Sequence, residues 1–262
     1  MAGPSIARKL ISAERAAAVA QFTSNAFEMA ALKRLGGIGS RRSFDPGQIL
    51  FLEGDRARSV FIVAEGCIKL YKMLLDGRRQ ITAFLFRGDF LGLPVRGGRY
   101  VFTAEALTCA RVFSVTMERI ERLLDSSPEF ARKLMAFVFD ELAFAQDQIL
   151  LLGRKTALER VASFLLVLSR RQRAKGGRGD RIKLPMHQID IADYLGIRHE
   201  TVSRVLATLR RGGAIGSVAS DHISIESGVR LVALAGFEDE PKFVAQFRDF
   251  PWGSEASAAC LD

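Results

Sequence analysis

Glycines divide the first half of the chain into short apolar runs, and this pattern limits the architectures that this half can adopt. Between residues 41 and 116 the runs are rich in β-branched and aromatic residues, as at 60–63 and 81–86. Among the glycines that separate them are Gly47, Gly54, Gly66, Gly77, Gly88 and Gly92. Short strands with a turn signal every 8–12 residues or so predict an all-β sandwich or barrel. Asp76-Gly77, which lies between two such runs, is the strongest local signal for a hairpin.

A barrel of this kind could be a metal-dependent enzyme, a ligand sensor or a scaffold, and the positions of the histidines separate these possibilities. His187, His199 and His222 are all the histidines of the chain, and all lie outside residues 41–116. A cupin-like metal site in the barrel would therefore lack its histidine ligands. We expect no catalytic residues, no metal, no cofactor and no enzymatic activity.

After Pro128 the apolar residues follow a helical period with alternating steps of four and three, which is the spacing of a heptad seam. Such a helix could instead pack on the barrel, because large residues beside the seam, including Leu134, Phe137 and Phe144, supply a second apolar face. Both interpretations can hold together, and a helix with two apolar stripes suits a parallel homodimer. The steps begin at Ala131, and the predicted dimer seam consists of Met135, Val138, Leu142, Ala145, Ile149 and Leu152.

The positive charge of the chain is concentrated in one segment. The whole chain has a formal net charge of +9 and a pI of about 9.9. Residues 153–211 contain fourteen Lys or Arg and five Asp or Glu, an excess equal to that of the whole chain. A solvated basic face is the plain explanation, but such a concentration favours a polyanionic partner such as nucleic acid.

Residues 184–206 carry the pattern of two helices that meet at a tight turn. Such a pair needs a small residue where the helices cross, a glycine at the turn and apolar residues on the buried faces. Ala192, Gly196 and Val202 occupy those positions. The remaining apolar set is Ile191, Leu195, Ile197, Val205 and Leu206. We interpret this stretch as a helix-turn-helix, with a helix before it at 156–171 and a small β-hairpin, the wing, at 214–225.

The second helix would lie in the major groove of double-stranded DNA with its first turns nearest the bases. Arg204 suits bidentate donation to guanine, Glu200 suits acceptance from a cytosine amino group, and Ser203 suits a small contact to thymine. Glu200 could instead be an N-terminal charge that the helix dipole favours. The expected supporting or phosphate contacts are Arg198, His199, Thr201, Arg210 and Arg211.

The cysteines and the longest apolar runs indicate the compartment. Cys67, Cys109 and Cys260 lie far apart and form no CxxC pair, which is typical of a reducing cytoplasm. Charged residues interrupt the Ala-rich N-terminal stretch, and no window approaches the roughly 18 apolar residues of a membrane span. We expect a soluble, cytoplasmic protein.

In these motifs the sequence resembles the CRP/FNR superfamily of bacterial transcription regulators, and more closely its FNR and FixK-like branches. The resemblance runs from about residue 41 to 236. The segments that carry it are Leu70-Tyr71-Lys72, 76–81, 88–93, Gln148-Ile149-Leu150-Leu151-Leu152 and 200–204.

The family implies an α+β fold with a cyclic-nucleotide-binding-like antiparallel β-roll, a long dimerisation helix and a C-terminal winged helix-turn-helix. The corresponding domains are a helical N-terminal extension (1–40), the β-roll (41–125), the dimerisation helix (126–153), the DNA-binding domain (154–228) and a tail (229–262).

The resemblance also implies a function. Members with the pattern Glu-x-x-Ser-Arg typically recognise a palindrome of the TTGAT-N4-ATCAA type, and Glu200, Ser203 and Arg204 match that pattern. The expected protein is a homodimeric transcription regulator, an activator, whose partners are DNA and RNA polymerase. The FixK-like branch suggests genes of low-oxygen metabolism, denitrification or nitrogen fixation.

Departures from the family narrow this expectation. Oxygen sensors of the FNR type carry an N-terminal cysteine cluster, whereas the first cysteine here is Cys67. Cyclic AMP binders carry an Arg-Ser/Thr pair for the phosphate, and this chain has Tyr100-Val101 there. Oxygen-sensing relatives place an aspartate on the dimer seam where this chain has Ala145, so the dimer is expected to form without a signal.

Two alternatives remain open at the level of sequence. One is a regulator of the same family that senses an effector, with a small molecule or haem in the β-roll or with Cys67 and Cys109 as redox sites. Isolated cysteines in apolar β-runs are, however, more often small core residues. The other is a nucleotide-binding interaction module whose basic segment contacts acidic proteins.

Overall fold

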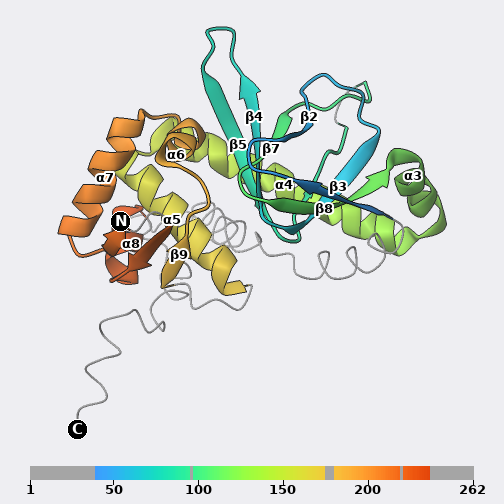
Figure 1. Cartoon of the computed structure of the whole chain (residues 1–262). Coiled ribbons are helices and arrows are strands. Elements are labelled where there is room, and N and C mark those ends of the chain that lie inside the picture. The colour runs from blue at the N-terminus through green and yellow to red at the C-terminus, as the bar shows by residue number, and fades with distance from the viewer. Residues whose placement is uncertain (1–38, 95–96, 175–179, 219–220, 237–262) are drawn as a thin grey trace, which may run out of the picture. The chain divides into compact units, whose positions relative to one another are not determined.

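The computed structural model describes residues 39–94, 97–174, 180–218 and 221–236 (Figure 1). These residues form two compact units, 39–139 and 140–236. The first contains the strands of the roll and the second contains the helix-turn-helix, which confirms the predicted α+β class. The expected N-terminal helical extension, except for its last two residues, and the end of the tail from residue 237 lie outside the described residues.

Two antiparallel sheets build the roll within the described residues. One has the strand order β1-β8-β3-β6 and the other the order β2-β7-β4-β5. Their core is formed by inward-facing residues of both sheets, among them Phe61, Val63, Ile68 and Ala104. The strands are β1 (Ser40–Phe44), β2 (Ile49–Phe51), β3 (Ser59–Glu65), β4 (Cys67–Met73), β5 (Arg79–Phe86), β6 (Phe90–Leu91), β7 (Thr103–Ala106) and β8 (Ala110–Thr116).

The hairpin between β4 and β5 forms where the Asp76-Gly77 pair predicts it. Gly77 has a φ of 80°, in the left-handed region that a side chain disfavours. The Asp76 carboxylate accepts hydrogen bonds from the backbone N–H of Arg78 at 3.0 Å and from its Nε at 2.7 Å. The turn is therefore closed by its own sequence.

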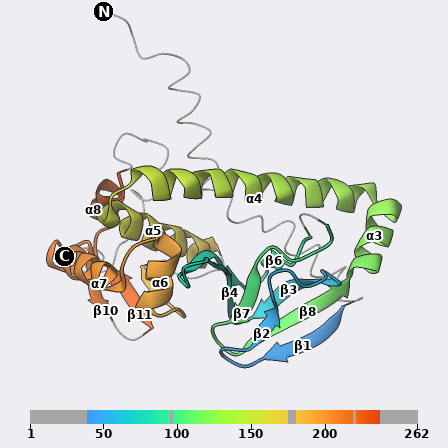
Figure 2. The same cartoon turned by 90° about the horizontal axis from the view of Figure 1, so that it is seen from above.

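Helices α3 (Met117–Ser126) and α4 (Pro128–Arg154) follow the roll. Ile120 of α3 and the first turns of α4 bury their apolar residues against the outer face of β3 and β8. The Phe137 ring contacts the Phe90 ring edge-on, with centroids 5.7 Å apart. Leu134 and Phe137 thus form the core-facing stripe that the sequence suggested, and α4 continues as one long helix (Figure 2). Helix α3 was not expected from the sequence.

The second unit surrounds helix α5, whose apolar residues Val161, Leu165 and Leu166 are buried. Strands β10 and β11 pair antiparallel, as predicted for the wing, and β9 adds a third strand beside β11. Neither β9 nor α8, which packs on α5, was expected from the sequence. The elements are α5 (Ala157–Ala174), β9 (Arg181–Lys183), α6 (Gln188–Leu195), α7 (His199–Arg211), β10 (Ile215–Val218), β11 (His222–Ile225) and α8 (Gly228–Leu234).

Helix α4, with 27 residues, is the longest helix of the described ranges. Among the described residues no helix combines the length and the hydropathy that crossing a membrane requires. Nor do the described residues contain a group of three or more His, Cys, Asp or Glu side chains that could hold a metal ion.

Candidate nucleic-acid interface

Helices α6 and α7 form the predicted helix-turn-helix, and local sequence explains where α6 begins and ends. At its start the buried Asp190 carboxylate accepts from the backbone N–H of His187 at 3.2 Å. At its end Gly196 has a φ of 62°, and the backbone N–H of Ile197 donates to the Ala192 carbonyl at 3.1 Å. A methyl group at Gly196 would meet no atom closer than 3.8 Å, so the backbone conformation rather than space calls for glycine.

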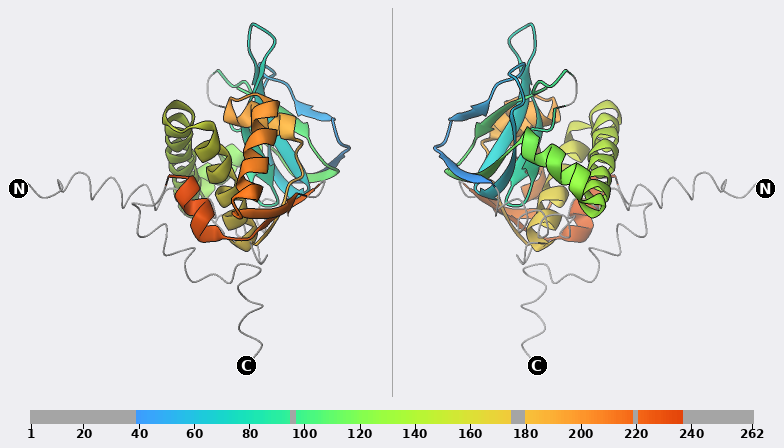
Figure 3. Two further views of the ribbon diagram at one scale, coloured as in Figure 1. Left: turned by 90° about the vertical axis from the view of Figure 1, so that its left-hand side faces the viewer. Right: turned by 90° about the vertical axis from the view of Figure 1, so that its right-hand side faces the viewer.

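Helix α7 separates an apolar face from a polar one. Val202, Leu206 and Leu209 are buried against the rest of the unit. Glu200, Ser203 and Arg204 are exposed, and their spacing places them on one face of the helix. The ribbon of α7 is drawn in orange in Figure 3. The structure therefore brings the three predicted base-contacting residues together on a face that is open to a partner.

The side chains of this face make only weak contacts with one another. Arg204 Nη2 lies 3.4 Å from Thr201 Oγ1, and His199 Nδ1 lies 3.5 Å from Glu200 Oε2 with both side chains about 60% exposed. Contacts of this length on exposed groups contribute little to stability. DNA can therefore replace them at small cost.

The supporting residues are distributed around the start and the end of α7. Arg198 occupies the N-cap position without a capping hydrogen bond from its side chain and is exposed, as is His199, whereas Thr201 is half-buried. Arg211 is exposed and lies almost in line with Glu200 along the helix, because eleven residues make about three turns. Arg210 is exposed about a quarter turn away from that line.

Part of the basic segment is structural and does not face a partner. Arg171 is only 9% exposed. Burial, together with the charge of Arg173, lowers the pKa of Arg170 to about 10. Arg160 is part-buried and donates hydrogen bonds to backbone carbonyls. The positive charge that can meet an anion is therefore smaller than the sequence count, although α7 keeps its exposed arginines.

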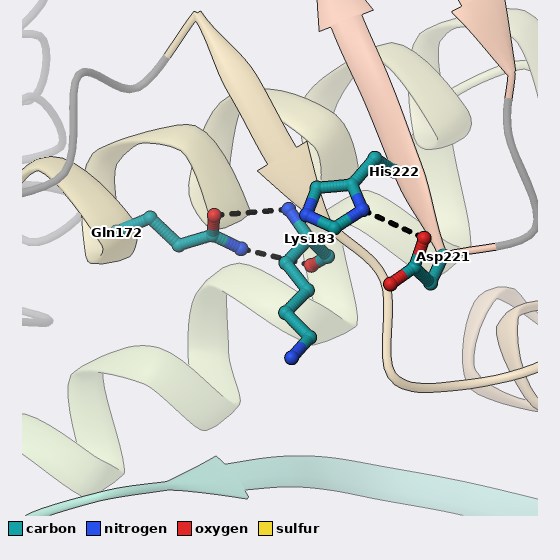
Figure 4. Close-up of polar contacts among 4 residues, drawn as sticks. All are labelled: Gln172, Lys183, Asp221 and His222. Atoms are coloured by element: carbon teal, nitrogen blue, oxygen red, sulfur yellow. Dashed lines mark hydrogen bonds and ion pairs between the residues drawn. The ribbon is translucent and has the colours of Figure 1, made fainter.

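The base of the wing has its own polar contacts, which the sequence did not predict (Figure 4). The Gln172 side chain donates to the Lys183 carbonyl at 2.8 Å and accepts from its N–H at 3.0 Å, so it completes the free edge of β9. On β11, His222 Nδ1 lies 2.7 Å from Asp221 Oδ1. This hydrogen bond lowers the pKa of the Asp221 carboxyl, and the charge of Lys183 adds to the effect. The alternation Arg181-Ile182-Lys183 was the available signal for β9.

The residues of the predicted dimer seam lie on the surface of α4. Met135, Val138, Leu142 and Ile149 are 55%, 42%, 55% and 70% exposed. Ala145 is exposed as well, whereas Leu152 is half-buried beside the α6–α7 turn. Phe139, at 61% exposure, extends this stripe and was not included in the prediction. Its position next to Val138 was the available signal.

Aromatic side chains are buried in the roll at the position where cyclic AMP binders are expected from the sequence to carry their phosphate-binding arginine. Tyr100 is 6% exposed, and its ring stacks on Phe51 with centroids 3.8 Å apart. Its hydroxyl donates to the Ser59 carbonyl at 2.6 Å. Elsewhere in the roll the buried Lys69 forms an ion pair with Glu105 at 2.9 Å. This cation already has a carboxylate partner.

The two described cysteines have different environments. Cys67 is buried at the start of β4, as expected for a small core residue, and Cys109 is exposed in the turn before β8. Neither the sequence nor these positions assign a redox role to them.

Comparison with known proteins places this architecture among characterised ones. The family model for the cyclic nucleotide-binding domain matches residues 41–127 of this chain. The family model for the Crp-like helix-turn-helix domain matches residues 159–234. The second match extends through α8.

Individual relatives cover most of the chain. It is 39% identical over 211 residues to the nitrogen fixation regulation protein FixK of Bradyrhizobium diazoefficiens, covering 80% of this chain and 88% of FixK. It is 35% identical over 216 residues to the fumarate and nitrate reduction regulatory protein of Salmonella typhimurium, covering 82% and 85%. The solved structure of FixK2 from Bradyrhizobium japonicum has a TM-score of 0.71 at 38% identity and covers 75% of this chain and 97% of that one.

Proposed function

Because this chain belongs to the CRP/FNR family of DNA-binding transcription regulators, we propose that it binds a palindrome of the TTGAT-N4-ATCAA type as a homodimer. The genes it controls are those of nitrogen fixation or of low-oxygen metabolism, in keeping with the names of its relatives FixK and the fumarate and nitrate reduction regulator.

The observation that carries this proposal is the exposed face of α7. Arg204 presents a planar donor for guanine O6 and N7, Glu200 an acceptor for a cytosine amino group, and Ser203 a small hydroxyl between them. Phosphate repels a glutamate. The exposure of Glu200 on the same face as Arg204 and Arg211 therefore supports contact of this face with base edges as well as with the DNA backbone.

The exposed stripe on α4 supports the homodimer. Large apolar side chains are seldom left in water along several turns of a helix, and their heptad spacing suits a second copy of the same helix. Ala145 adds no charge to this stripe, so no signal is needed to relieve repulsion. Two copies of α7 would then lie about one turn of DNA apart, each in one half of the palindrome.

The roll acts as a scaffold in this proposal. Tyr100 and Phe51 fill its interior at the position of the missing arginine, and Lys69 is paired with Glu105, so a nucleotide phosphate would lack a charge-assisted partner there. In this proposal the outer surface of the roll contacts RNA polymerase, and the protein acts as an activator.

Binding of the purified protein to labelled DNA tests the proposal. We expect two chains to bind one palindrome, with an affinity at least about 1,000-fold higher than for a scrambled duplex at physiological salt. The variant Arg204→Ala should lose roughly 10- to 100-fold on the palindrome and little on the scrambled duplex, because it removes a base contact.

Two results would count against this function. Equal binding of the palindrome by wild type and Arg204→Ala at every salt concentration would exclude sequence recognition by α7. A requirement for added cyclic nucleotide before any specific binding would exclude the scaffold role of the roll.

A further inference from the structure

The side chain of Arg160, near the start of α5, joins the ends of two other helices. Its Nη2 donates to the carbonyl of Leu152 in the last turn of α4 at 2.8 Å, and its Nη1 donates to the carbonyl of Leu195, the last residue of α6, at 2.9 Å. Its Nε donates to the Lys155 carbonyl between α4 and α5 at 2.9 Å. Each nitrogen of the guanidinium thus donates to a different carbonyl.

These acceptors are the ones that a helix leaves open. The last four carbonyls of an α-helix have no partner within it, and they carry the negative end of the helix dipole. A guanidinium provides fixed, planar donors and a positive charge, so it can satisfy two helix ends at once and fix the angle between them. An ammonium group at the same place has its three donors on one nitrogen and no fixed plane, so it would fix the angle between the two ends less firmly.

Further hydrogen bonds and ring contacts join the same helix ends. Gln148, one turn before Leu152 in α4, donates to the hydroxyl of Tyr194 in α6. Tyr194 is buried with its ring against Phe164 of α5. The ammonium of Lys155 donates at 2.8 Å to Ser163 Oγ and at 2.8 Å to the carbonyl that follows α8. The end of α4, the start of α5 and the end of α6 therefore form one hydrogen-bonded corner.

From this geometry we propose that Arg160 is a positioning residue that fixes the direction of the helix-turn-helix relative to the end of α4, and thereby the spacing between half-sites that the protein accepts. The inference rests on the proposed homodimer, in which the two copies of α4 set the distance between the two copies of α7. Arg160 does not contact DNA in this role, because its donors are directed to carbonyls of the chain itself.

A panel of duplexes that differ only in the spacer tests this role. The panel contains two inverted TTGAT half-sites separated by two to six base pairs or so, and a single half-site. Wild type should bind one spacer at least about tenfold more tightly than a spacer one base pair longer or shorter, because two rigidly held helices match one separation. The measured quantity is the ratio of these two dissociation constants.

In Arg160→Met, which keeps an unbranched apolar stem and removes the guanidinium donors, we expect this ratio to fall to about threefold or less while binding to the single half-site stays unchanged. Arg154→Met is the matched control, because Arg154 is exposed at the end of α4 and its loss removes the same charge. It should keep the wild-type ratio. A loss of folded protein would weaken binding to every duplex equally and would leave the ratio unchanged.

If Arg160→Met does not fold, Arg160→Lys tests the positioning role of Arg160 instead. Its ammonium keeps the charge but cannot span three carbonyls, so the ratio should lie between those of wild type and Arg160→Met. A wild-type ratio in the variant that folds, or an equal fall in Arg154→Met, would overturn the role of Arg160. If wild type itself bound a single half-site as tightly as any palindrome, the proposed function would fail together with this inference, and that failure would be visible without any variant.

Discussion

Arg204 and Arg211 lie on the same exposed face of α7, Arg204 in its second turn and Arg211 as its last residue, and position along the helix separates their roles. The first turns of a recognition helix reach base edges, whereas residues near its end approach the phosphate backbone. The weak contacts of both guanidinium groups with threonine hydroxyls at 3.4 Å leave them available for DNA.

We therefore expect Arg211→Ala to weaken binding to all duplexes by a similar factor. The slope of the logarithm of affinity against the logarithm of salt concentration should fall by about two, because one phosphate contact is lost per chain and two chains bind one duplex. Titrations of the palindrome and of a scrambled duplex at several salt concentrations measure both effects. A loss confined to the palindrome would instead assign Arg211 to base contact.

Single residues also show where sequence analysis succeeds and where it stops. Glu200, Ser203 and Arg204 could be predicted to share an exposed face, because residue type and helical spacing are both local. Arg160 could not be distinguished from the other cations of the basic segment, since its partners are carbonyls up to 35 residues away. The core role of Tyr100 depends likewise on Phe51 in β2 and Ser59 in β3.

At the scale of whole elements, α4 carries two apolar faces, one packed and one exposed. The face with Leu134 and Phe137 packs on the roll, and the face with Met135, Leu142 and Ile149 is exposed. Sequence periodicity revealed both faces, because a long helix repeats its pattern many times. The shorter elements α3, β9 and α8 were missed, since seven to ten helical residues or three strand residues give little periodic signal and depend on neighbours.

The exposed face of α4 allows a test of the dimer that leaves the fold of one chain intact. Leu142→Glu places two carboxylates in the predicted seam, so the dimer dissociation constant should rise at least about 100-fold. Leu150→Glu is the matched control, because Leu150 is exposed on the same helix outside the seam. Analytical ultracentrifugation measures both, and dissociation of neither or of both variants would contradict the assigned seam.

At the scale of the whole molecule, the tyrosines report on the integrity of both compact units. The chain has three tyrosines: Tyr71 and Tyr100 belong to the roll, and Tyr194 belongs to the helix-turn-helix. Burial raises the pKa of each phenol above its ordinary value of 10.0, and Glu105 adds to the rise at Tyr71. The protonated phenol is therefore favoured in the folded state of each unit.

Because the unfolded chain releases these protons first, the free energy of unfolding should decrease as the pH rises above about 10, and no such loss is expected from the tyrosines below that pH. Phenolate absorbance in the near ultraviolet should appear near pH 10 in concentrated urea and at higher pH in the native protein. Urea unfolding at several alkaline pH values measures the accompanying loss of stability. In Tyr194→Phe the loss should be smaller than in wild type, since one of the three raised phenols is absent. Native and urea titrations that coincide would contradict the burial of these side chains.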